Sequence, residues 1–388
     1  MFLTIIAFLV VFSLLIFAHE LGHFWFARKF GVRAEEFGFG FPPRIWGIYK
    51  NKEGKWRQVG GNKEVEDAVS TIYSLNWIPI GGFVKIKGEN GENENEPDSF
   101  SSRKIWQRAA ILSAGVSMNI ILAAFLISLG LMIGFPQVLD NLDSRAEVSD
   151  KKIQIAQIMP DSPAAKTGFM AGDTIITINN KEFAVEEELQ DFVDGQAGQE
   201  LAYKIKRGQE EITLKAIPEI REETGRGGIG IAIATTGLVK YPWYLAIEEG
   251  LKETVLLTWA IILAFYELIK GLVMGQGVAI DVAGPVGIAA LTGQVAHMGL
   301  IYILQFTALL SINLAIINFF PFPALDGGRV LFLIIEKIKG SPVKRELEGA
   351  IHNIGFALLM LLVLVVTFRD VARFGDSFRA LWEKIIGN

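Results

Sequence analysis

The sequence contains no cysteine among its 388 residues. This absence excludes disulfide bonds, thiolate metal sites and cysteine nucleophiles, although it does not identify the compartment. Any metal ion must therefore be held by His, Asp or Glu side chains. Histidine is scarce as well, with four in the whole chain.

Charge is also scarce. Charged residues make up 20% of the chain and the formal net charge is -5, so no general attraction to nucleic acid is indicated. Hydrophobic residues make up 51%, which is too many for an ordinary soluble protein of this size. They are gathered into long runs with charged stretches between them, and this pattern predicts a membrane protein.

Four apolar runs are each long enough for a helix to cross about 30 Å of hydrocarbon. A signal peptide is a poor interpretation of the first run, which lacks a basic start and a small-residue cleavage site before Arg28. Segment 254–269 is short for a span and carries Glu267, so we interpret it as an interfacial or peripherally packed helix. The four predicted spans are residues 2–27, 109–135, 299–335 and 350–368.

Basic residues near the span ends predict the orientation of the chain. They follow the first span, precede the second, and lie between the third and the fourth, so these segments belong inside. The amino terminus, the long 136–298 region and the carboxyl-terminal tail then lie outside. The basic residues are Arg28, Lys29, Arg33, Arg44, Arg103, Lys104, Arg108, Lys337, Lys339, Lys344 and Arg345.

The first span contains the motif HELGH in otherwise apolar surroundings. On a helix, His19 and His23 project from one face because they are four residues apart, and both imidazoles can hold one ion. Glu20 is placed where a general base would reach a metal-bound water. Zinc with three protein ligands keeps one position for water and lowers its pKa to about 7, which suits peptide hydrolysis. A chance match is disfavoured, since an unpaired charge at bilayer depth costs several kcal/mol.

A third ligand must come from a distant part of the sequence, and Asp326 is the best candidate. It is the only acidic residue of the third span before Glu336, and it follows the helix breakers of NFFPFPALDGG. A broken helix inside a bilayer is tolerated where it is buried in protein or lines a wet cavity. The alternative role for Asp326 is a helix-capping carboxylate. His297 and His352 lie at span edges and are weaker candidates.

Two regions outside the spans predict β-structure. On the inner side, residues 34–47 and 71–87 combine aromatic and β-branched residues with Gly and Pro, which is typical of strands. The outer region has an alternating strand over 153–158, a strand and Asn-Asn turn in GDTIITINNKEF, the helix VEEELQDFV and the hairpin ELAYKIKRGQEEITLKAI. This order predicts a soluble α+β domain of about PDZ size.

These motifs resemble the site-2 proteases, a family of intramembrane zinc metalloproteases, and in particular the bacterial regulator-of-sigma-E protease type. HELGH matches the zinc motif of that family, and NFFPFPALDGGR matches its second motif. FGFGFPPRIW and IPIGGFVKIKGE resemble its membrane re-entrant β segments, and SPAAKTGFMAGDTIITINNKEF resembles its PDZ domain. In AGVSMN of the second span, Val116 stands where the family usually has proline.

The resemblance implies a bacterial cytoplasmic (inner) membrane protein whose amino terminus and PDZ-like domain are extracytoplasmic and whose zinc site lies toward the cytoplasmic side. Its implied substrates are single-pass transmembrane proteins. The implied cofactor is one zinc ion per chain. The implied residue roles are zinc ligands at His19, His23 and Asp326, the catalytic base at Glu20, and hydrogen bonds to the substrate backbone from Asn313 and Asn318, for which polar contacts between helices are the alternative.

The predicted function is hydrolysis of a peptide bond within or near the transmembrane segment of another membrane protein, after a first external cleavage. A helix hides its backbone in hydrogen bonds, so the scissile carbonyl must first be freed. The inner strands offer edges to which an unwound substrate can add, and Gly81 and Gly82 permit close approach, a tight turn being the alternative.

The outer domain is predicted to exclude bulky ectodomains or to bind a newly exposed carboxyl terminus. The candidate carboxylate loop is GGIGI, with Gly228, Ile229 and Gly230, and an ordinary glycine-rich turn is the alternative. Two other functions remain: a catalytically inert PDZ-bearing membrane scaffold and a metal transporter. The intact HELGH favours the protease over the scaffold, and a transporter needs several polar positions along a pathway.

The predicted fold class is a multi-pass α-helical membrane protein with about four transmembrane helices, re-entrant β segments and an inserted α+β PDZ-like domain. Its predicted parts are a first transmembrane helix (1–27), an inner and re-entrant β region (28–104), a second helix (105–135), the PDZ-like domain (145–235), a linker with an amphipathic or peripheral helix (236–298), a third transmembrane segment (299–337), a fourth helix (350–368) and an outer tail (369–388).

Overall fold

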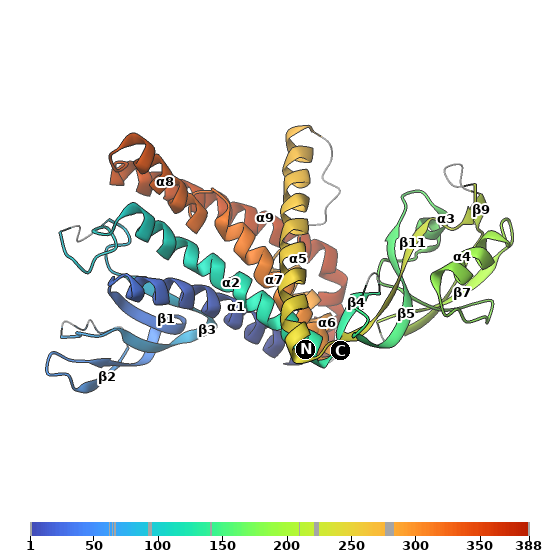
Figure 1. The fold of residues 1–388 in the computed structure, drawn as a ribbon, viewed down its shortest axis with the longest axis horizontal. Helices are drawn as coiled ribbons and strands as arrows, with labels where there is room; N and C mark the ends of the chain where they lie inside the picture. Colours follow the sequence, from blue (N-terminus) through green and yellow to red (C-terminus); the bar gives the residue numbers. More distant parts are fainter. Residues whose placement is uncertain are drawn as a thin grey trace. The chain divides into compact units, whose positions relative to one another are not determined.

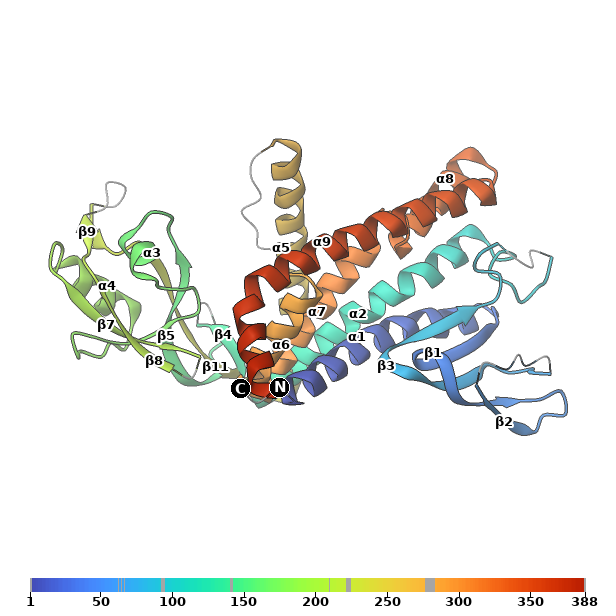
Figure 2. The ribbon, with the colours of Figure 1, turned by 180° about the vertical axis from the view of Figure 1, so that it is seen from behind.

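The structure is a computed structural model that describes residues 2–61, 63, 65, 67–91, 95–139, 142–208, 210–220, 225–275 and 283–386. Its contacts divide the chain into two compact units. We call Met1–Ile127 together with Glu249–Asn388 the membrane unit, and Ser128–Glu248 the inserted unit. Figures 1 and 2 show the two units from opposite sides.

Five helices in the described part of the chain are long and apolar enough to cross a membrane, so the predicted multi-pass helical fold is confirmed. In both views α2 lies between α1 and α7 (Figures 1 and 2). The five are α1 (Phe2–Lys29), α2 (Ile105–Ile133), α5 (Trp243–Val273), α7 (Leu300–Phe319) and the Arg345–Ala372 part of α9 (Arg345–Ile386).

The long third apolar segment forms two helices, α7 and α8 (Asp326–Lys339), with a break between them. Pro321 and Pro323 fall in this break, where they have no amide hydrogen to donate to a helix. A Cβ atom at Gly327 would lie 2.2 Å from the carbonyl oxygen of Phe319, so the chain can turn this tightly only with glycine there. The break brings Asp326 to the first turn of α8.

Two helices are longer than the sequence indicated. The helix expected over 254–269 is the 31-residue α5, and α9 continues through the expected outer tail to Ile386. The remaining helix of the membrane unit is α6 (Pro285–Met298), whose Gly287 amide donates to the buried Asp370 carboxylate of α9 at 2.7 Å. A carboxylate at a helix amino terminus is stabilised by the unsatisfied amides there.

The strands expected on the inner side are present as an antiparallel sheet of order β2-β1-β3. These are β1 (Ala34–Lys50), β2 (Trp56–Gly60) and β3 (Ile72–Ile86). Strand β3 is fastened to α1, because the hydroxyl of Ser13 donates to the carbonyl of Pro79 at 3.1 Å and accepts from the amide of Gly81 at 3.2 Å. The site therefore has a strand on one side of the HELGH helix.

The inserted unit is an antiparallel six-stranded sheet of order β4-β11-β5-β6-β7-β8, with two short helices. The alternating strand, the turn, the helix and the hairpin expected from the sequence are all present. The elements are β4 (Phe135–Val138), β5 (Glu147–Ile158), α3 (Pro163–Thr167), β6 (Thr174–Ile178), α4 (Glu186–Asp194), β7 (Leu201–Arg207), β8 (Glu210–Ala216) and β11 (Ile231–Lys240), with the small pair β9 (Glu219–Ile220) and β10 (Gly227–Gly228).

One hydrophobic core holds the inserted unit together. Ile155, Ile178 and Tyr203 of the sheet pack with Ala164 of α3 and Leu189 of α4, and all five side chains are buried. The Asn-Asn turn predicted after β6 has positive φ at both residues, which asparagine tolerates better than most residues do. The unit is therefore an ordinary water-soluble α+β fold in its packing.

Candidate metal centre and active site

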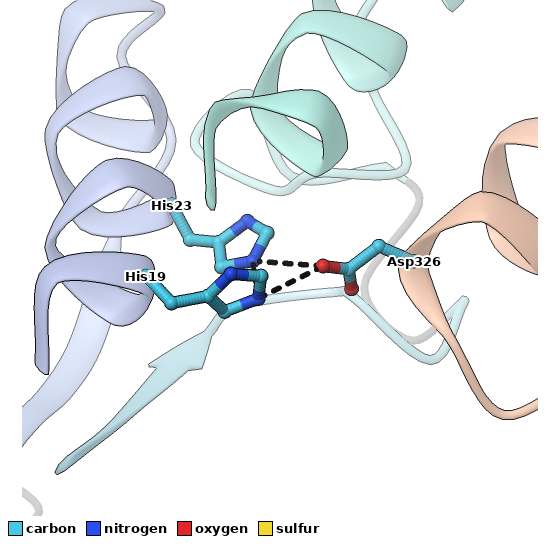
Figure 3. Close-up of side chains that lie close together, drawn as sticks. All are labelled: His19, His23 and Asp326. Atoms are coloured by element: carbon cyan, nitrogen blue, oxygen red, sulfur yellow. Dashed lines mark hydrogen bonds and ion pairs between the residues drawn. The ribbon is translucent and has the colours of Figure 1, made fainter. Parts of the chain in front are cut away.

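The structure brings the two histidines of HELGH and the aspartate of LDGG together (Figure 3). The Nε2 atoms of His19 and His23 lie 3.1 Å apart. The Asp326 Oδ2 atom lies 3.0 Å from the first and 3.2 Å from the second. The two histidines come from α1 and the aspartate from α8, 303 residues further along the chain from His23. The two sequence motifs, one in α1 and one at the start of α8, therefore come together in the fold.

Glycines let the helices approach closely enough for this. A Cβ atom at Gly22 of α1 would lie 2.3 Å from the carbonyl oxygen of Ala114 in α2. A Cβ atom at Gly115 would lie 2.4 Å from His23 Nε2 and 2.8 Å from His19 Nε2. Any side chain at position 115 would therefore occupy the space between the two imidazoles and α2. Small residues play this part generally between membrane helices.

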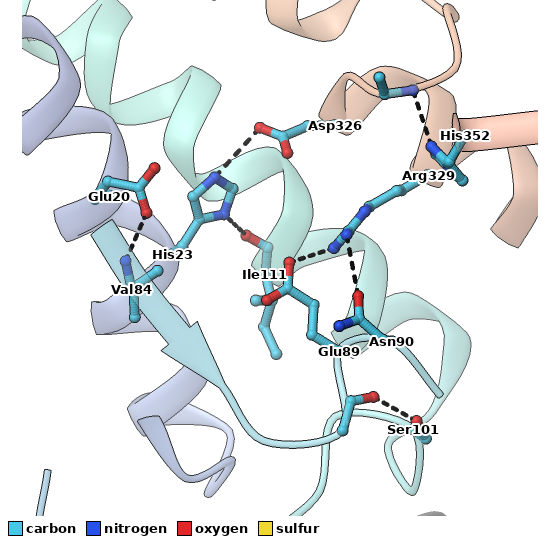
Figure 4. A network of polar contacts seen from close by, with 12 residues as sticks. Glu20, His23, Val84, Glu89, Asn90, Ser101, Ile111, Asp326, Arg329 and His352 are labelled. Carbon is cyan, nitrogen blue, oxygen red and sulfur yellow. Dashed lines mark hydrogen bonds and ion pairs between the residues drawn. The ribbon is translucent and has the colours of Figure 1, made fainter. Parts of the chain in front are cut away.

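The orientation of His23 is fixed by a backbone group of α2. Its Nδ1 atom lies 2.9 Å from the carbonyl oxygen of Ile111, which can only accept a hydrogen bond (Figure 4). The Nδ1 atom of a neutral His23 therefore carries the proton, and Nε2 carries the lone pair that faces Asp326. A histidine that ligates a metal is usually held by such a contact at its other nitrogen.

Glu20 lies beside the three side chains and is hydrogen-bonded to the three-stranded sheet. The amide of Val84 in β3 donates to Glu20 Oε2 at 3.0 Å (Figure 4). Among the described residues, no hydrogen bond reaches the other carboxylate oxygen. This contact also shows that β3 passes within hydrogen-bond distance of the acidic side chain of the site.

A polar network surrounds the start of α8. Arg329 pairs with Glu89, and its guanidinium lies 3.5 Å from the Asn90 side-chain oxygen (Figure 4). His352 accepts a hydrogen bond from the amide of Ala324 at 2.9 Å. This histidine therefore braces the break before α8 and does not belong to the cluster with Asp326. His297 is exposed and lies outside that cluster too.

The predicted substrate-binding residues do not belong to the cluster of His19, His23 and Asp326. The Asn313 side-chain amide donates to the carbonyl of Leu309 in its own helix at 2.9 Å. The Asn318 side chain makes no hydrogen bond to another described residue. Gly81 and Gly82 lie within β3, and Gly81 has a positive φ of 74°, a conformation that favours glycine. A Cβ atom at Gly81 would lie 2.7 Å from Ile16, so this glycine allows β3 to approach α1.

The predicted carboxylate loop borders a cavity of about 220 Å³ in the inserted unit. Gly228, Ile229 and Gly230 line this cavity together with Leu189 of α4 and Ile233 of β11. The neighbouring Gly227 amide already donates to the Asp194 carboxylate at 2.6 Å. The first amide of the GGIGI segment is therefore already paired within the inserted unit.

Sequence reasoning overlooked Ile111, Gly115 and Asn119 of α2, which line the imidazoles. Asn119 is fully buried, and its amide lies 3.4 Å from His19 Nδ1. An asparagine in an apolar span was the available signal, since polar groups at membrane depth usually have a function. The positions of Ile111 and Gly115 carried no comparable signal in the sequence.

The cluster fits a zinc ion. Tetrahedral zinc has bonds of about 2.0–2.1 Å to nitrogen and oxygen, so its ligand atoms lie about 3.3 Å from one another. The observed separations of 3.0, 3.1 and 3.2 Å are close to this value. Asp326 Oδ2 is buried and accepts no hydrogen bond in the described part of the chain, which suits an atom intended for a cation.

Two HExxH histidines, a carboxylate from a second helix and an adjacent glutamate, held among membrane-type helices, define a zinc metalloprotease. The family model for Peptidase family M50 matches residues 7–59 and 63–362. The chain belongs to this family, and the resemblance to site-2 proteases is thereby confirmed.

Relatives are similar over almost their whole length. The chain is 30% identical to the zinc metalloprotease RasP of Geobacillus kaustophilus, over 96% of this chain and 98% of the relative. It is also 30% identical to the regulator of sigma-W protease RasP of Bacillus subtilis, over 95% and 98% respectively. Among solved structures, the PDZ domain of an SdrC-like protein from Listeria monocytogenes is 25% identical and covers 22% of this chain and 92% of that domain, with a TM-score of 0.21.

Proposed function

We propose that this zinc metalloprotease cleaves single-pass membrane proteins within or near their transmembrane segments, after a first cleavage outside the membrane. The observation that carries the proposal is the convergence of His19, His23 and Asp326 beside Glu20, within helices long enough to cross a bilayer. A peptide bond cut at this place must itself lie in or next to the membrane.

His19, His23 and Asp326 would hold one zinc ion per chain. When bound there, zinc supplies a Lewis acid that polarises the scissile carbonyl and makes water a better nucleophile at neutral pH. Glu20 takes the proton from the attacking water on its free carboxylate oxygen and passes it to the leaving amine nitrogen. The Val84 amide keeps the other oxygen in place during both transfers.

Strand β3 is the element that we propose for substrate binding. It runs beside Glu20, and Gly81 and Gly82 let it lie close to α1 without a side chain in the way. An unwound substrate can add to such a strand through main-chain hydrogen bonds, which require little side-chain specificity. Asn313 and Asn318 of α7 would bind the backbone of the same extended segment from the opposite side.

We infer that the inserted unit selects substrates outside the membrane. Its cavity beside Gly228, Ile229 and Gly230 can accept a carboxyl terminus generated by the first cleavage. The basic residues near the ends of the spans support an orientation with this unit and the amino terminus outside and the zinc site toward the cytoplasm. In this proposal the full α5 replaces the peripheral helix expected within 236–298, and α9 continues through the tail expected over 369–388.

The first test is the zinc content of the purified full chain in detergent, for the native protein and for Asp326→Ala. We expect about one zinc per native chain, and a large loss in the variant, since removing one of three protein ligands opens the site. A folded native chain without zinc would overturn the metal site. Zinc retained at full occupancy without Asp326 would show that another side chain is the third ligand.

The second test compares membrane fractions of cells that carry the native chain or Glu20→Gln. Glutamine keeps an oxygen for the Val84 amide but cannot take a proton, so zinc should remain bound while trimmed single-pass fragments accumulate. Unchanged fragment levels with zinc bound would support the scaffold and contradict the protease.

A further inference from the structure

One stripe of α2 faces both histidine ligands. Ile111, Gly115 and Asn119 follow one another at intervals of four residues, so they lie on the same face of the helix. His19 and His23 are also four residues apart on α1. Ile111 contacts His23, Gly115 leaves room between the two rings, and Asn119 contacts His19. Successive turns of α2 therefore lie against successive turns of α1 at the site.

Both histidines need the same kind of partner at Nδ1. Each imidazole must present an unprotonated Nε2 atom to the ion, which means that its Nδ1 atom carries the proton and needs an acceptor. For His23 the acceptor is the Ile111 carbonyl oxygen at 2.9 Å. For His19 the only neighbour of Nδ1 with a hydrogen-bonding group among the described contacts is the Asn119 side chain, at 3.4 Å.

The Asn119 amide can face His19 in two ways. In the structure the amide nitrogen is the atom 3.4 Å from Nδ1. As a donor there it would move the imidazole proton to Nε2 and remove the lone pair that the ion needs. In this orientation Asn119 Oδ1 is buried and has no hydrogen-bond partner among the described residues. The oxygen and nitrogen of an amide are assigned from the hydrogen-bond network, and a half-turn exchanges them.

Asn119 is also held firmly in place. Its side chain is fully buried, and its backbone carbonyl accepts a hydrogen bond of 2.7 Å from the hydroxyl of Ser311 in α7, which is fully buried too. This bond fixes α2 against α7 at the turn that faces His19. The contact between α2 and α7 therefore fixes the backbone of Asn119, and burial restricts its side chain.

We propose that Asn119 is a positioning residue for His19: its side-chain oxygen accepts the Nδ1 proton and so presents Nε2 to zinc. The proposal rests on the proposed function, because it assumes that His19 is a zinc ligand. Ile111 and Asn119 then hold the two histidines in the same tautomer, one through a backbone oxygen and one through a side-chain oxygen. Gly115 provides the space between them.

The test is a zinc titration of the purified full chain against a competing chelator, with no substrate present. Asn119→Leu keeps the volume and removes the acceptor, and we expect its zinc affinity to fall about 10- to 100-fold. Asn119→Asp can only accept at this position, so its affinity should stay within a few-fold of the native value. Ser117→Ala, an exposed position on the same helix, is the matched control and should bind as the native chain does.

The outcomes separate this proposal from the proposed function. If the native chain binds no zinc, the metal site itself is wrong. If the native chain binds zinc and Asn119→Leu binds it equally well, Asn119 has no part in positioning His19. Equal weakening in the Asp and Leu variants would mean that Asn119 acts as a donor or only by packing, which also overturns the proposal. Asn119→Ala, which adds neither bulk nor charge, gives the same comparison if either variant does not fold.

Discussion

The membrane unit and the inserted unit are packed by different means. In the inserted unit, large apolar side chains such as Ile155 and Tyr203 are buried in one core. In the membrane unit, large apolar side chains such as Phe125 and Trp259 are exposed, whereas Gly115 and Asn119 are buried at the site. Lipid is as apolar as leucine, so helices in a membrane gain little from burying leucine and depend on close contact and polar bonds. An exposed large apolar side chain is therefore ordinary on a membrane helix, whereas in the inserted unit such side chains form the core.

The largest effect should come from filling the space at Gly115. In Gly115→Leu the new side chain would begin 2.4 Å from His23 Nε2, so the imidazoles must move apart and we expect no measurable zinc binding. Chelator competition on the purified chain measures this. Gly349→Leu is the matched control, because no atom lies within 4 Å of a Cβ atom there, and it should bind zinc normally. Normal zinc binding by Gly115→Leu would contradict the close packing of α1 on α2.

The second largest effect is expected when the buried ion pair of the inserted unit, Arg207 with Asp173, is broken. Arg207 donates to both carboxylate oxygens of Asp173, at 2.8 and 2.7 Å, and the Asp173 side chain is only 1% exposed. Arg207→Met would leave this carboxylate buried without its cation. We expect a loss of about 2–3 kcal/mol, at the low end for a buried pair because Arg207 itself is partly exposed.

Hydrogen exchange of the β6 and β7 amides in the full chain would measure that loss. Lys215→Met, which breaks an exposed pair with Glu200, should leave the same amides unchanged. Equal protection in Arg207→Met and in the native chain would show that the core alone stabilises the inserted unit.

A smaller effect of opposite sign is expected at Tyr203. Burial raises the pKa of this tyrosine, and its hydroxyl has no hydrogen-bond partner among the described residues. Tyr203→Phe removes a polar group that is buried without compensation, so the inserted unit should gain about 1 kcal/mol. Thermal unfolding of the unit in the full chain checks this. Tyr203→Leu, which also removes the ring packed on Phe169, should instead destabilise it.

The smallest effect is a pH dependence at Asp98 of the membrane unit. The hydrogen bond from Lys87, at 2.7 Å, lowers the pKa of Asp98. A carboxyl with a lowered folded-state pKa adds stability above its unfolded value of about 3.9, and this stability is lost as the pH falls through the folded pKa. The contact between Asp98 and Lys87 should therefore weaken only below about pH 4.

Carbon NMR of the Asp98 carboxyl would follow that titration. In Lys87→Met the Asp98 pKa should rise toward its ordinary value, whereas Lys85→Met, which breaks the pair with Glu35, should leave it unchanged. An Asp98 pKa that is the same with and without Lys87 would contradict the proposed contact.

Much of the fold could be predicted from local patterns. The period of the apolar runs indicated the long helices, and strand alternation and the Asn-Asn turn indicated the inserted sheet. The ends of α5 could not be predicted, because charged residues such as Glu267 interrupt its apolar run while the exposed helix continues past them. The division of the third segment was signalled by Pro321 and Pro323, but its geometry depends on the contact between Gly327 and Phe319.

The sequence by itself determined the chemistry of the site, because His19 and His23 are four positions apart and so share one face of a helix, with Glu20 adjacent to His19. It also made Asp326 the leading third candidate, since few acidic residues lie at membrane depth. Only the tertiary structure decided which groups hold the histidines. The partners Ile111 and Asn119 are 88 and 100 residues from the rings they contact, and the register of α2 on α1 depends on packing that no local pattern encodes.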